Sequence, residues 1–561
     1  MILIDWAIVV AYLLYVVIDG LRGSSQPQKL DNFLLAGRSL PWWAVGLSIM
    51  ATQMSAITLV GTTGQAYSSG LRFIQFYFGL PLAMVLLCFT AVPFFHRARV
   101  FTAYEYLERR FDTRTRTLTS FIFLITRGLS CGVIIAAPAV ILSIILGWDE
   151  RWTVLAMGFS TTLYTMFGGT KAVAWADVKQ MAVIVSGVLV TMFVIVHQLP
   201  PDVSWFGALQ IAAVSGKLQA VDTHFDLHET YTLWSGLLGG LFLMLAYFGC
   251  DQSQVQRYLS ARSVDEGRVS LLFNGLAKIP LQLMILFMGI FVFAVYQFER
   301  PPMVFQKVAA QRALAGPYGD EFSKLNARYE SEFNSRQLAA HDLIKPDAPS
   351  TAKTEYIRAN TEIDSIRRQA SEVIQKTTGE TKFSDVNYIF PTFITQRIPH
   401  GLLGWLIAAI FAAAMSAVAG ELNALSTATT IDFYRRFGWS GSLEQSEKND
   451  EKILRASRWI TAFWGCVACT VAMNVARLGS LIEVVNKLGS YFYGSILGVF
   501  VLAVCFPMAK SRGAFYGLMA GIATVALVAH TTTVSFLWYN LVGCVAVVMV
   551  GLTLSLVPIK T

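Results

Sequence analysis

Long apolar stretches separated by shorter polar ones run along almost the whole of the 561-residue chain. A transmembrane helix needs roughly 20 consecutive, mostly apolar residues to cross the hydrocarbon core of a bilayer. Thirteen stretches approach or exceed that length, and each predicts a membrane-spanning helix. They cover residues 2–19, 40–68, 72–95, 118–146, 152–168, 178–198, 232–250, 270–297, 398–431, 454–475, 483–507, 512–530 and 534–557. The first has neither a basic flank nor a small-residue cleavage site, so we expect a retained helix.

One long segment, about residues 300–397, does not follow this pattern. It is rich in Ala, Glu, Lys, Arg, Gln and Ser, and it contains no glycine-rich or catalytic motif. Within it, Ile357, Ile363, Ile366 and Val373 lie among charged residues and give one modest apolar face to a helix. We expect a small helical cap, inserted into a loop outside the membrane.

The composition agrees with a membrane protein. Hydrophobic residues make up 55% of the chain and charged residues only 14%, whereas soluble domains have roughly 25% charged residues. The seven cysteines lie in or beside apolar stretches, so we expect no disulfide framework. The predicted spans contain neither an HExxH nor a GxSxG motif, and we therefore expect a protein that is not an enzyme.

Lysine and arginine are concentrated in every second loop. Because positive charge near the ends of spans is retained in the cytoplasm, this pattern predicts an N-terminus outside and a C-terminus inside the plasma (inner) membrane. It also explains most of the net charge of +8 without a nucleic-acid partner. The predicted cytoplasmic loops carry Arg22, Lys29, Arg38, Arg97, Arg99, Arg109, Arg110, Arg114, Arg116, Lys171, Lys179, Arg257, Arg262, Arg268, Arg435, Arg436, Lys448, Lys452, Lys510 and Arg512.

The predicted fold class is an all-α membrane protein with about 13 transmembrane helices and a 5+5 inverted-repeat core. Without the first span and the last two, ten spans remain. Five is an odd number, so two five-helix sets that share a fold enter the membrane from opposite sides, as in alternating-access transporters. We expect a first helix and cytoplasmic loop at 1–39, repeats at 40–198 and 232–507, an extracytoplasmic loop at 199–231 and two final helices at 508–561.

Each set is expected to open on an interrupted helix. Unwound backbone at membrane depth is tolerated where it lines a cavity, and its carbonyls can then coordinate a cation. Glycines that let helices approach closely are the alternative explanation. The signals are the run ATQMS at 51–55 with Gly61, Gly64 and Gly70, and later Gly236, Gly239, Gly240 and Gly249.

Three separated motifs resemble the sodium:solute symporter family. They are GRSLPWWAVG at 37–46, GGTKAV at 168–173 with Trp175, Asp177 and Gln180, and the run 412–432. The resemblance spans nearly the whole chain and implies the leucine-transporter-type fold of sodium/glucose cotransporters. It also implies that uptake of a sugar, polyol, amino acid, vitamin or organic anion is coupled to the sodium gradient.

The resemblance further implies a sodium ion between the break in the first core helix and the eighth core helix. Its ligands would be the backbone carbonyls of Ala51, Met54 and Ala413 and the hydroxyl of Ser416. The family places a second hydroxyl residue directly after that serine, where this chain has Ala417. The site therefore has one oxygen fewer, for which water or the nearby Thr52 would have to compensate.

Asp177 is a candidate for a second cation. The resemblance implies that an acid at this position helps to bind or release a further cation, and acids in or near the membrane are functional candidates in general. The alternative is a solvated carboxylate that pairs with Lys171 or Lys179.

The candidate substrate residues come from several spans. The resemblance matches Tyr247 to a gate tyrosine that stacks on the substrate, and Lys278 to a lysine in the next span. Gln53 belongs to the interrupted first core helix. Thr58 and Tyr77 stand where sugar-carrying members have the acidic and amide side chains that bind the sugar, so we do not expect a galactose-like specificity.

Arg127 lies deep in a predicted span, where a charge is costly unless it faces a cavity or a partner. It either pairs with a carboxylate such as Glu421 or binds an anionic substrate. We favour the pairing.

The predicted function is secondary active transport by alternating access, in which sodium is the cofactor and a small organic solute crosses the lipid bilayer. The solute would be a sugar, a polyol or an organic anion. Because Ala417 removes a sodium ligand, a proton-coupled transporter and a transporter-like solute sensor are the alternatives. Sodium-driven accumulation of solute in proteoliposomes distinguishes among them.

Overall fold

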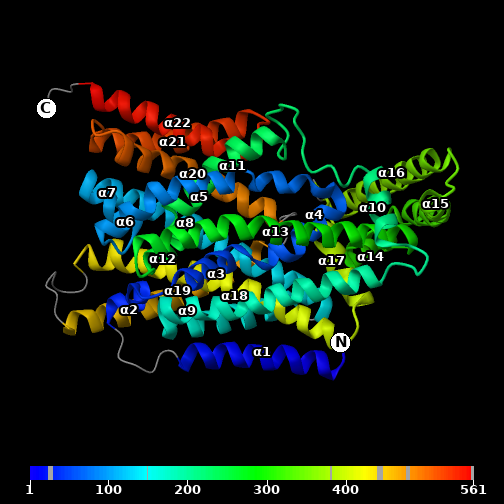
Figure 1. Ribbon diagram of the computed structural model, residues 1–561, viewed down its shortest axis with the longest axis horizontal. Coiled ribbons are helices and arrows are strands. Elements are labelled where there is room, and N and C mark those ends of the chain that lie inside the picture. The colour runs from blue at the N-terminus through cyan, green and yellow to red at the C-terminus, as the bar shows by residue number, and fades with distance from the viewer. Residues whose placement is uncertain (23–28, 148, 380–381, 439–446, 476–480, 558–561) are drawn as a thin grey trace.

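The computed structural model describes residues 1–22, 29–147, 149–379, 382–438, 447–475 and 481–557 (Figure 1). These residues form helices and no β-strand, apart from one isolated bridge between Leu40 and Ala261. Most of the helices lie along the long axis of the molecule. The predicted all-α fold class is confirmed.

The helices vary widely in length, and short 3-10 and π-helical segments interrupt or extend several of them. In chain order they are α1 (Leu3–Arg22), α2 (Leu30–Leu35), η1 (Ala36–Arg38), α3 (Trp42–Gln53), η2 (Ile57–Gly61), α4 (Thr62–Ser69), η3 (Gly70–Tyr77), α5 (Gly79–Phe89), α6 (Ala91–Ala98), α7 (Ala103–Arg110), α8 (Thr113–Leu146), α9 (Glu150–His197), α10 (Trp205–Val214), η4 (Ser235–Gly239), α11 (Gly240–Cys250), α12 (Gln252–Leu259), α13 (Val264–Phe298), α14 (Lys307–Ala315), α15 (Gly319–Ile344), α16 (Ala352–Thr378), α17 (Val386–Arg397), α18 (Leu402–Ala428), η5 (Thr429–Arg435), α19 (Glu447–Val475), α20 (Leu481–Cys505), α21 (Ser511–Thr531) and α22 (Leu537–Leu556).

Nine helical stretches within the described residues are long and apolar enough to cross a membrane, so this is a multi-pass membrane protein. The expected count of thirteen is not confirmed. Two predicted spans, 152–168 and 178–198, both fall within α9, a 48-residue stretch of two helices that meet at a kink at Gly169. The segment Ser235–Cys250 is shorter than a full span. The nine stretches are Leu3–Arg22, Ile57–Ala98, Thr113–Val140, Glu150–His197, Val264–Phe298, Leu402–Arg435, Asn486–Cys505, Ser511–Thr531 and Leu537–Leu556.

The helix that begins at Trp42 is interrupted where the sequence predicts it. Helix α3 ends at Gln53, and Met54 has φ −89° and ψ 73°, outside the helical region. The chain turns helical again at η2 and continues into α4. The break leaves backbone carbonyls at the end of α3 without the helical partners that would satisfy them.

The second predicted interruption lies elsewhere than the glycines suggest. Gly236 falls within the helical turn η4, and a Cβ there would lie 2.0 Å from the carbonyl oxygen of Gln75. The glycine thus allows close helix packing, which was the alternative explanation. The backbone instead becomes extended at Asp251, with φ −85° and ψ 123°, between α11 and α12.

Helix α9 changes direction at Gly169, which has φ 60° and ψ −168°. A side chain is strained in this conformation. A Cβ would also lie 2.7 Å from the carbonyl oxygen of Phe33. The GGTKAV motif therefore bends the helix against α2.

Helix α18 is the central helix of the bundle. Every residue from Leu406 to Ala428 is buried, and the helix packs against α1, α3, α8 and α9. The outer helix α1 is attached to its start, because Asp5 Oδ1 accepts hydrogen bonds from the N–H groups of Gly401 (2.6 Å) and Gly404 (3.2 Å). A carboxylate at a helix N-terminus satisfies free N–H groups and complements the helix dipole.

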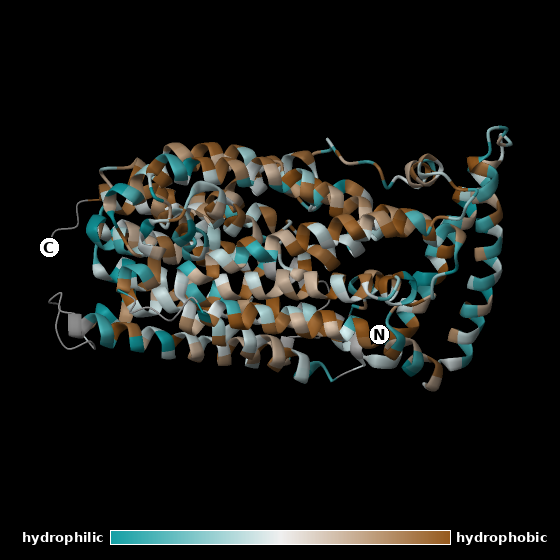
Figure 2. Ribbon diagram, turned by 60° about the horizontal axis from the view of Figure 1, so that its bottom comes forward, coloured by the Kyte–Doolittle hydropathy of each residue, from teal (hydrophilic) through white to brown (hydrophobic). Residues whose placement is uncertain are grey.

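The 300–397 segment is helical and forms α14 to α17. Figure 2 shows its hydrophilic helices projecting from one end of an otherwise largely hydrophobic bundle. Tyr329, Phe333, Ile363 and Ile366 belong to its own small core. Its α15 is fixed to the end of α13, where Arg336 Nη2 donates to a backbone carbonyl 2.8 Å away.

Candidate functional site

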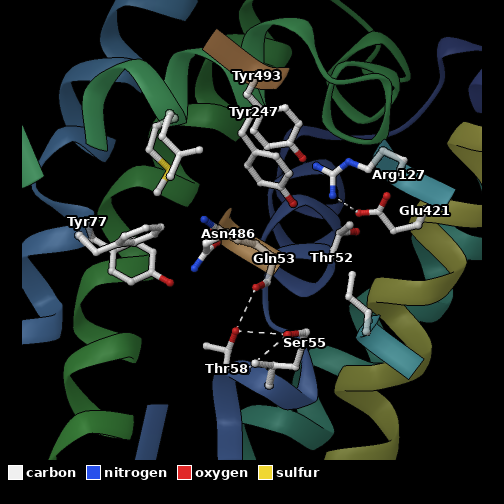
Figure 3. Close-up of a pocket in the computed structure, with 15 residues that line it drawn as sticks. Thr52, Gln53, Ser55, Thr58, Tyr77, Arg127, Tyr247, Glu421, Asn486 and Tyr493 are labelled. Carbon is white, nitrogen blue, oxygen red and sulfur yellow. Dashed lines mark hydrogen bonds and ion pairs between the residues drawn. The ribbon is translucent and has the colours of Figure 1, made fainter. Parts of the chain in front are cut away.

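A cavity of about 120 Å³ lies at the break between α3 and η2. Its walls come from the broken helix and from η3, α8, α11, α18 and α20. The lining includes Thr52, Gln53, Ser55, Thr58, Tyr77, Arg127, Leu243, Met244, Tyr247, Glu421, Asn486 and Tyr493 (Figure 3). Five of the six candidate substrate residues, Gln53, Thr58, Tyr77, Arg127 and Tyr247, are thus brought together, and Lys278 is not part of the lining.

Arg127 is held by carboxylates from two other helices. Its Nη1 lies 2.7 Å from Glu421 Oε1 on α18, as the sequence suggested. Its Nε lies 2.5 Å from Asp251 Oδ2 at the break between α11 and α12. The guanidinium carbon lies over the rings of Tyr247 and Tyr493, 5.0 and 5.3 Å from their centroids. Since a buried cation needs paired anions and hydrogen bonds, this cluster fixes Arg127 between α8, α11, α12 and α18.

Two polar atoms in this cluster have no hydrogen-bond partner among the described residues. They are Arg127 Nη2 and Glu421 Oε2, both buried, in side chains that line the cavity. Unpaired buried donors and acceptors are rare because each carries a desolvation cost of about 1–3 kcal/mol. A ligand that offers an acceptor to the arginine would remove this cost.

The cavity has a second polar region. Tyr77 and Arg127 lie on opposite sides of it in Figure 3. Gln53 Oε1 is buried and unpaired, and the Asn486 amide has no hydrogen-bond partner within the part of the chain that the structure describes. Thr58 Oγ1 donates to the Gln53 carbonyl at 3.4 Å. A solute bound here meets the Arg127–Glu421 ion pair on one side and neutral polar groups elsewhere.

Lys278 lies behind the cavity wall and not in it. The side chain is fully buried, its Nζ is 2.9 Å from Met54 Sδ, and it lies over the Tyr77 ring at 5.4 Å. The ammonium group thus contacts Met54 at the helix break and the ring of Tyr77, and only Tyr77 of these three residues lines the cavity. The structure assigns Lys278 to the support of the helix break and not to the pocket lining.

The region predicted to bind sodium contains a buried hydrogen-bonded cluster. Ser416 Oγ donates to Asp177 Oδ1 at 2.6 Å, and Ser48 Oγ donates to Asp177 Oδ2 at 2.6 Å. Arg257 Nη1 lies 2.9 Å from Asp177 Oδ2 and donates to Ser48 Oγ at 2.8 Å. The cluster joins α3, α9, α12 and α18 just below the helix break.

The alternative explanation required Asp177 to be solvated and paired with a nearby lysine, and the structure shows neither. Its side chain is 0% exposed. Lys179 points away and pairs with Asp19 on α1 at 2.6 Å. The carboxylate interacts instead with Arg257, which the charge pattern had placed among cytoplasmic loop residues.

The donor set proposed for sodium consists of neutral, hard oxygens, which suit a small hard cation. Met54 has left the helix, and α3 packs against α18. The hydroxyl of Ser416 donates its hydrogen bond to Asp177, which leaves the oxygen lone pairs free to coordinate a cation. Thr52 is close to this region, with its hydroxyl donating to the Ser48 carbonyl at 2.9 Å.

Sequence reasoning missed four residues of these clusters, Ser48, Asp251, Arg257 and Tyr493. Asp251 had a usable signal, because it is an acid placed directly after an apolar run that carries candidate residues. Arg257 had none, since its position in a basic stretch fits a loop equally well. Tyr493 lies in an apolar helix where an aromatic residue is unremarkable in sequence.

Comparison with known proteins identifies relatives along most of the chain. A model of the Sodium:solute symporter family matches residues 33–314 and 372–521. The unmatched residues 315–371 lie in the helical segment that comprises α14 to α17. The chain is 26% identical over 522 residues to sodium-coupled monocarboxylate transporter 2 of Bos taurus, which covers 92% of this chain and 71% of that protein.

Two bacterial relatives are similar at a comparable level. The sodium/sialic acid symporter NanT of Aliivibrio fischeri is 25% identical over 552 residues, covering 96% of this chain and 90% of its own. The sodium/glucose cotransporter of Vibrio parahaemolyticus is 25% identical over 529 residues, covering 92% and 83%.

The fold also matches a solved structure, a Na⁺-coupled sialic acid symporter in a substrate-bound outward-open state. The TM-score is 0.76, with 22% sequence identity, and the match covers 98% of this chain and 97% of that one.

Proposed function

Because the chain belongs to the sodium:solute symporter family and is a sodium-coupled symporter of a small organic solute, we propose that this solute is an organic acid. The observation that carries the proposal is Arg127 Nη2, a buried donor without a partner among the described residues, in a side chain that lines the cavity. A carboxylate fits the edge of a guanidinium group and forms short, charge-assisted hydrogen bonds with it.

The charges around Arg127 give a physical reason why binding of an acidic solute would depend on binding of sodium. Arg127, Asp251 and Glu421 together carry a formal charge of −1, and Asp251 also accepts the N–H of Ser253 at the start of α12 (2.9 Å). The helix N-terminus offsets part of the Asp251 charge. A sodium ion bound nearby would supply positive charge that reduces the electrostatic repulsion between this cluster and an anionic solute.

The rest of the cavity points to a hydroxylated solute. Gln53 Oε1 and the Asn486 amide have no partners among the described side chains, and the Tyr77 ring closes the opposite wall. Hydroxyl groups on the solute would satisfy these amides, whereas a purely aliphatic tail would leave them unpaired at a cost. A sugar acid or another hydroxy acid meets both conditions.

For sodium we propose the carbonyls of Ala51, Met54 and Ala413 with the hydroxyl of Ser416. The helix break at Met54 and the hydrogen bond from Ser416 to Asp177 support this set. Asp177 then acts through Ser416 and not as a site for a second cation, because Arg257 already neutralises it.

We further propose the 5+5 inverted repeat over 40–198 and 232–507, with the N-terminus outside and the C-terminus in the cytoplasm. Helix α1 begins at the end of the molecule that carries α15 and α16, and α22 ends at the opposite end (Figure 1). One broken helix, α3 to α4, belongs to the first set, and another, α11 to α12, belongs to the second. This arrangement supports opposite orientations of the two sets.

Ligand-induced thermal stabilisation of the purified protein in sodium tests the organic-acid proposal. N-acetylneuraminate, gluconate and lactate are compared with neutral partners of similar shape, namely N-acetylneuraminate methyl ester, glucitol and propane-1,2-diol. We expect at least one acid to raise the melting temperature while its neutral partner does not, because ligand binding stabilises the folded state. Equal stabilisation by an acid and its neutral partner would contradict the role of Arg127.

The same measurement on Arg127→Lys keeps the charge but removes the planar fork. We expect the acid-induced shift to shrink or disappear. Because Asp251 and Glu421 retain a cation beside them, the variant without ligand should still unfold cooperatively, which separates loss of binding from loss of folding.

A further inference from the structure

A second hollow opens on the side of the helical bundle, apart from the solute cavity. Its volume is about 450 Å³, and it lies between the start of α8, the start of α21 and the segment that follows α18. Phe121, Phe433, Phe437 and Phe515 form most of its wall, and Arg114 lies at one end. We call it the phenylalanine groove.

The apolar part of the groove is exposed beside the first turns of α8, a helix that is long and apolar enough to cross a membrane. Phe121 is 51% exposed and Phe437 is 48% exposed, although both are large apolar side chains. Arg114 and Phe121 are seven residues apart on α8, a rise of about 10 Å along the helix. This is shorter than half of the roughly 30 Å hydrocarbon core, so the groove spans part of one leaflet.

The charged end of the groove carries positive charge that no acidic side chain neutralises among the described residues. Arg114 is exposed and has no hydrogen bond or ion pair among the described residues. Arg512 is also exposed and likewise unpaired within them, and it lies three residues before Phe515 on the same face of α21. Asp112 is the nearest acid in sequence, but its Oδ1 accepts the N–H of Thr115 at 2.8 Å.

Two other arginines close to the groove, Arg116 and Arg436, are already paired with acids. Arg116 Nη2 lies 2.6 Å from Asp432 Oδ1, and its Nη1 lies 2.6 Å from Glu108 Oε2. Arg436 Nε donates to Glu108 Oε1 at 2.7 Å. At the edge of the apolar wall, Arg114 and Arg512 therefore remain without an acidic partner among the described residues.

We propose that the phenylalanine groove binds an anionic phospholipid, with the phosphate between Arg114 and Arg512 and an acyl chain along Phe121, Phe433 and Phe437. Unpaired cations at the level of the headgroups attract anionic lipids, and basic pockets between transmembrane helices are suited to them. A free phosphate leaves the phenylalanine wall uncovered, and a neutral lipid leaves the arginines without an anion. Only a ligand with both parts matches the groove.

Native mass spectrometry of the full chain tests this proposal. The protein is released from micelles that contain equal amounts of phosphatidylglycerol and phosphatidylcholine. We expect the wild type to retain phosphatidylglycerol in preference to phosphatidylcholine. Arg114→Gln should lower that retention about fivefold, the equivalent of about 1 kcal/mol for one arginine.

The matched control is Arg97→Gln, which removes an exposed arginine from α6 at the same end of the bundle but outside the groove (Figure 1). It should leave lipid retention unchanged. Arg512→Gln is the second variant, and it should reproduce the loss if Arg114→Gln does not fold. The proposal would be overturned if the wild type retained the two lipids equally, or if Arg114→Gln and Arg97→Gln lost lipid equally. It would also be overturned if the protein were released as a dimer without bound lipid, because a second copy of the chain would then be the better candidate to cover the groove.

Discussion

Asp177 lies 2.9 Å from Arg257 in the interior of the bundle, and both side chains are at most 3% exposed. The acid belongs to α9 and the arginine to α12, so the pair joins two helices that are far apart in sequence. The same carboxylate accepts the hydroxyl proton of Ser416, a proposed sodium ligand. The charge of Asp177 is therefore already balanced within the protein, beside the proposed cation site.

We expect one sodium ion per transport cycle for this reason. Sodium activation of solute uptake should follow a Hill coefficient of about 1. The reason is that Asp177, the carboxylate of this cluster, already has Arg257 as its counter-charge and does not need a second sodium ion. The ratio of sodium to solute flux in proteoliposomes checks the number directly. A ratio of two would show that Asp177 exchanges Arg257 for a second sodium ion.

Removal of the Asp177 charge should destabilise the protein strongly. Asp177→Asn leaves Arg257 buried without an anion, for which we expect a loss of about 3–5 kcal/mol in the free energy of unfolding. Asp19→Asn is the matched control, because Asp19 also pairs with a cation, Lys179 on α9, but is 31% exposed. That change should cost less than about 1 kcal/mol. Similar shifts in melting temperature for both variants would refute the assigned role of the buried pair.

Ala417→Ser should strengthen sodium binding. The change places a hydroxyl directly after Ser416 on α18 and supplies a fifth oxygen to the proposed ligands. We expect the sodium concentration for half-maximal uptake to fall about fivefold, equivalent to roughly 1 kcal/mol for one added polar contact. Ala414→Ser is the control, since Ala414 is equally buried on the same helix. An unchanged sodium dependence in Ala417→Ser would move the cation site away from Ser416.

Glu108 lies on α7, outside the membrane-spanning stretches, and we expect it to make the stability of the protein depend on pH. Burial alone would raise its pKa, but hydrogen bonds from Arg436, Arg116 and Thr113 lower the pKa of this carboxyl to about 2, from an ordinary value of 4.5. A depressed folded-state pKa stabilises the protein above the unfolded value, and this stabilisation is lost as the pH falls from about 4.5 towards 2.

Glu108→Gln should therefore lower the melting temperature at neutral pH, and its difference from the wild type should shrink as the pH falls through that range. Glu355→Gln, at an exposed position on α16, is the control and should show no such trend. A difference between wild type and Glu108→Gln that stays constant with pH would contradict the assigned network.

Much of the fold could be predicted because hydrophobic runs of membrane length have few alternatives. The break at residues 51–55 was also predictable, since polar residues and glycines interrupt an apolar run there. The break at Asp251 was not, because the nearby glycines are used for close packing and their sequence signal is the same. The nine apolar stretches are fewer than the thirteen expected spans partly because α9 contains two helices that meet at the Gly169 kink.

The candidate site was predictable where a charge occurs deep in an apolar run. Arg127 with Glu421 could be proposed as a pair because each is costly in hydrocarbon without the other. Arg257 could not, since an arginine near the end of a span normally indicates topology, and only the three-dimensional structure shows that α12 turns inward towards Asp177. Lys278 was placed in the pocket by resemblance, but in the structure it contacts Met54 and Tyr77 and is not among the residues that line the cavity.

Sodium-driven uptake into proteoliposomes tests the central claim most directly. The solute is the acid that gives the largest thermal stabilisation, and its accumulation is measured with an inward sodium gradient, with equal sodium on both sides and with potassium instead. We predict accumulation above the external concentration only with the gradient, and loss of that accumulation in Arg127→Lys. Binding without sodium-driven accumulation, or unchanged accumulation in Arg127→Lys, would contradict the account.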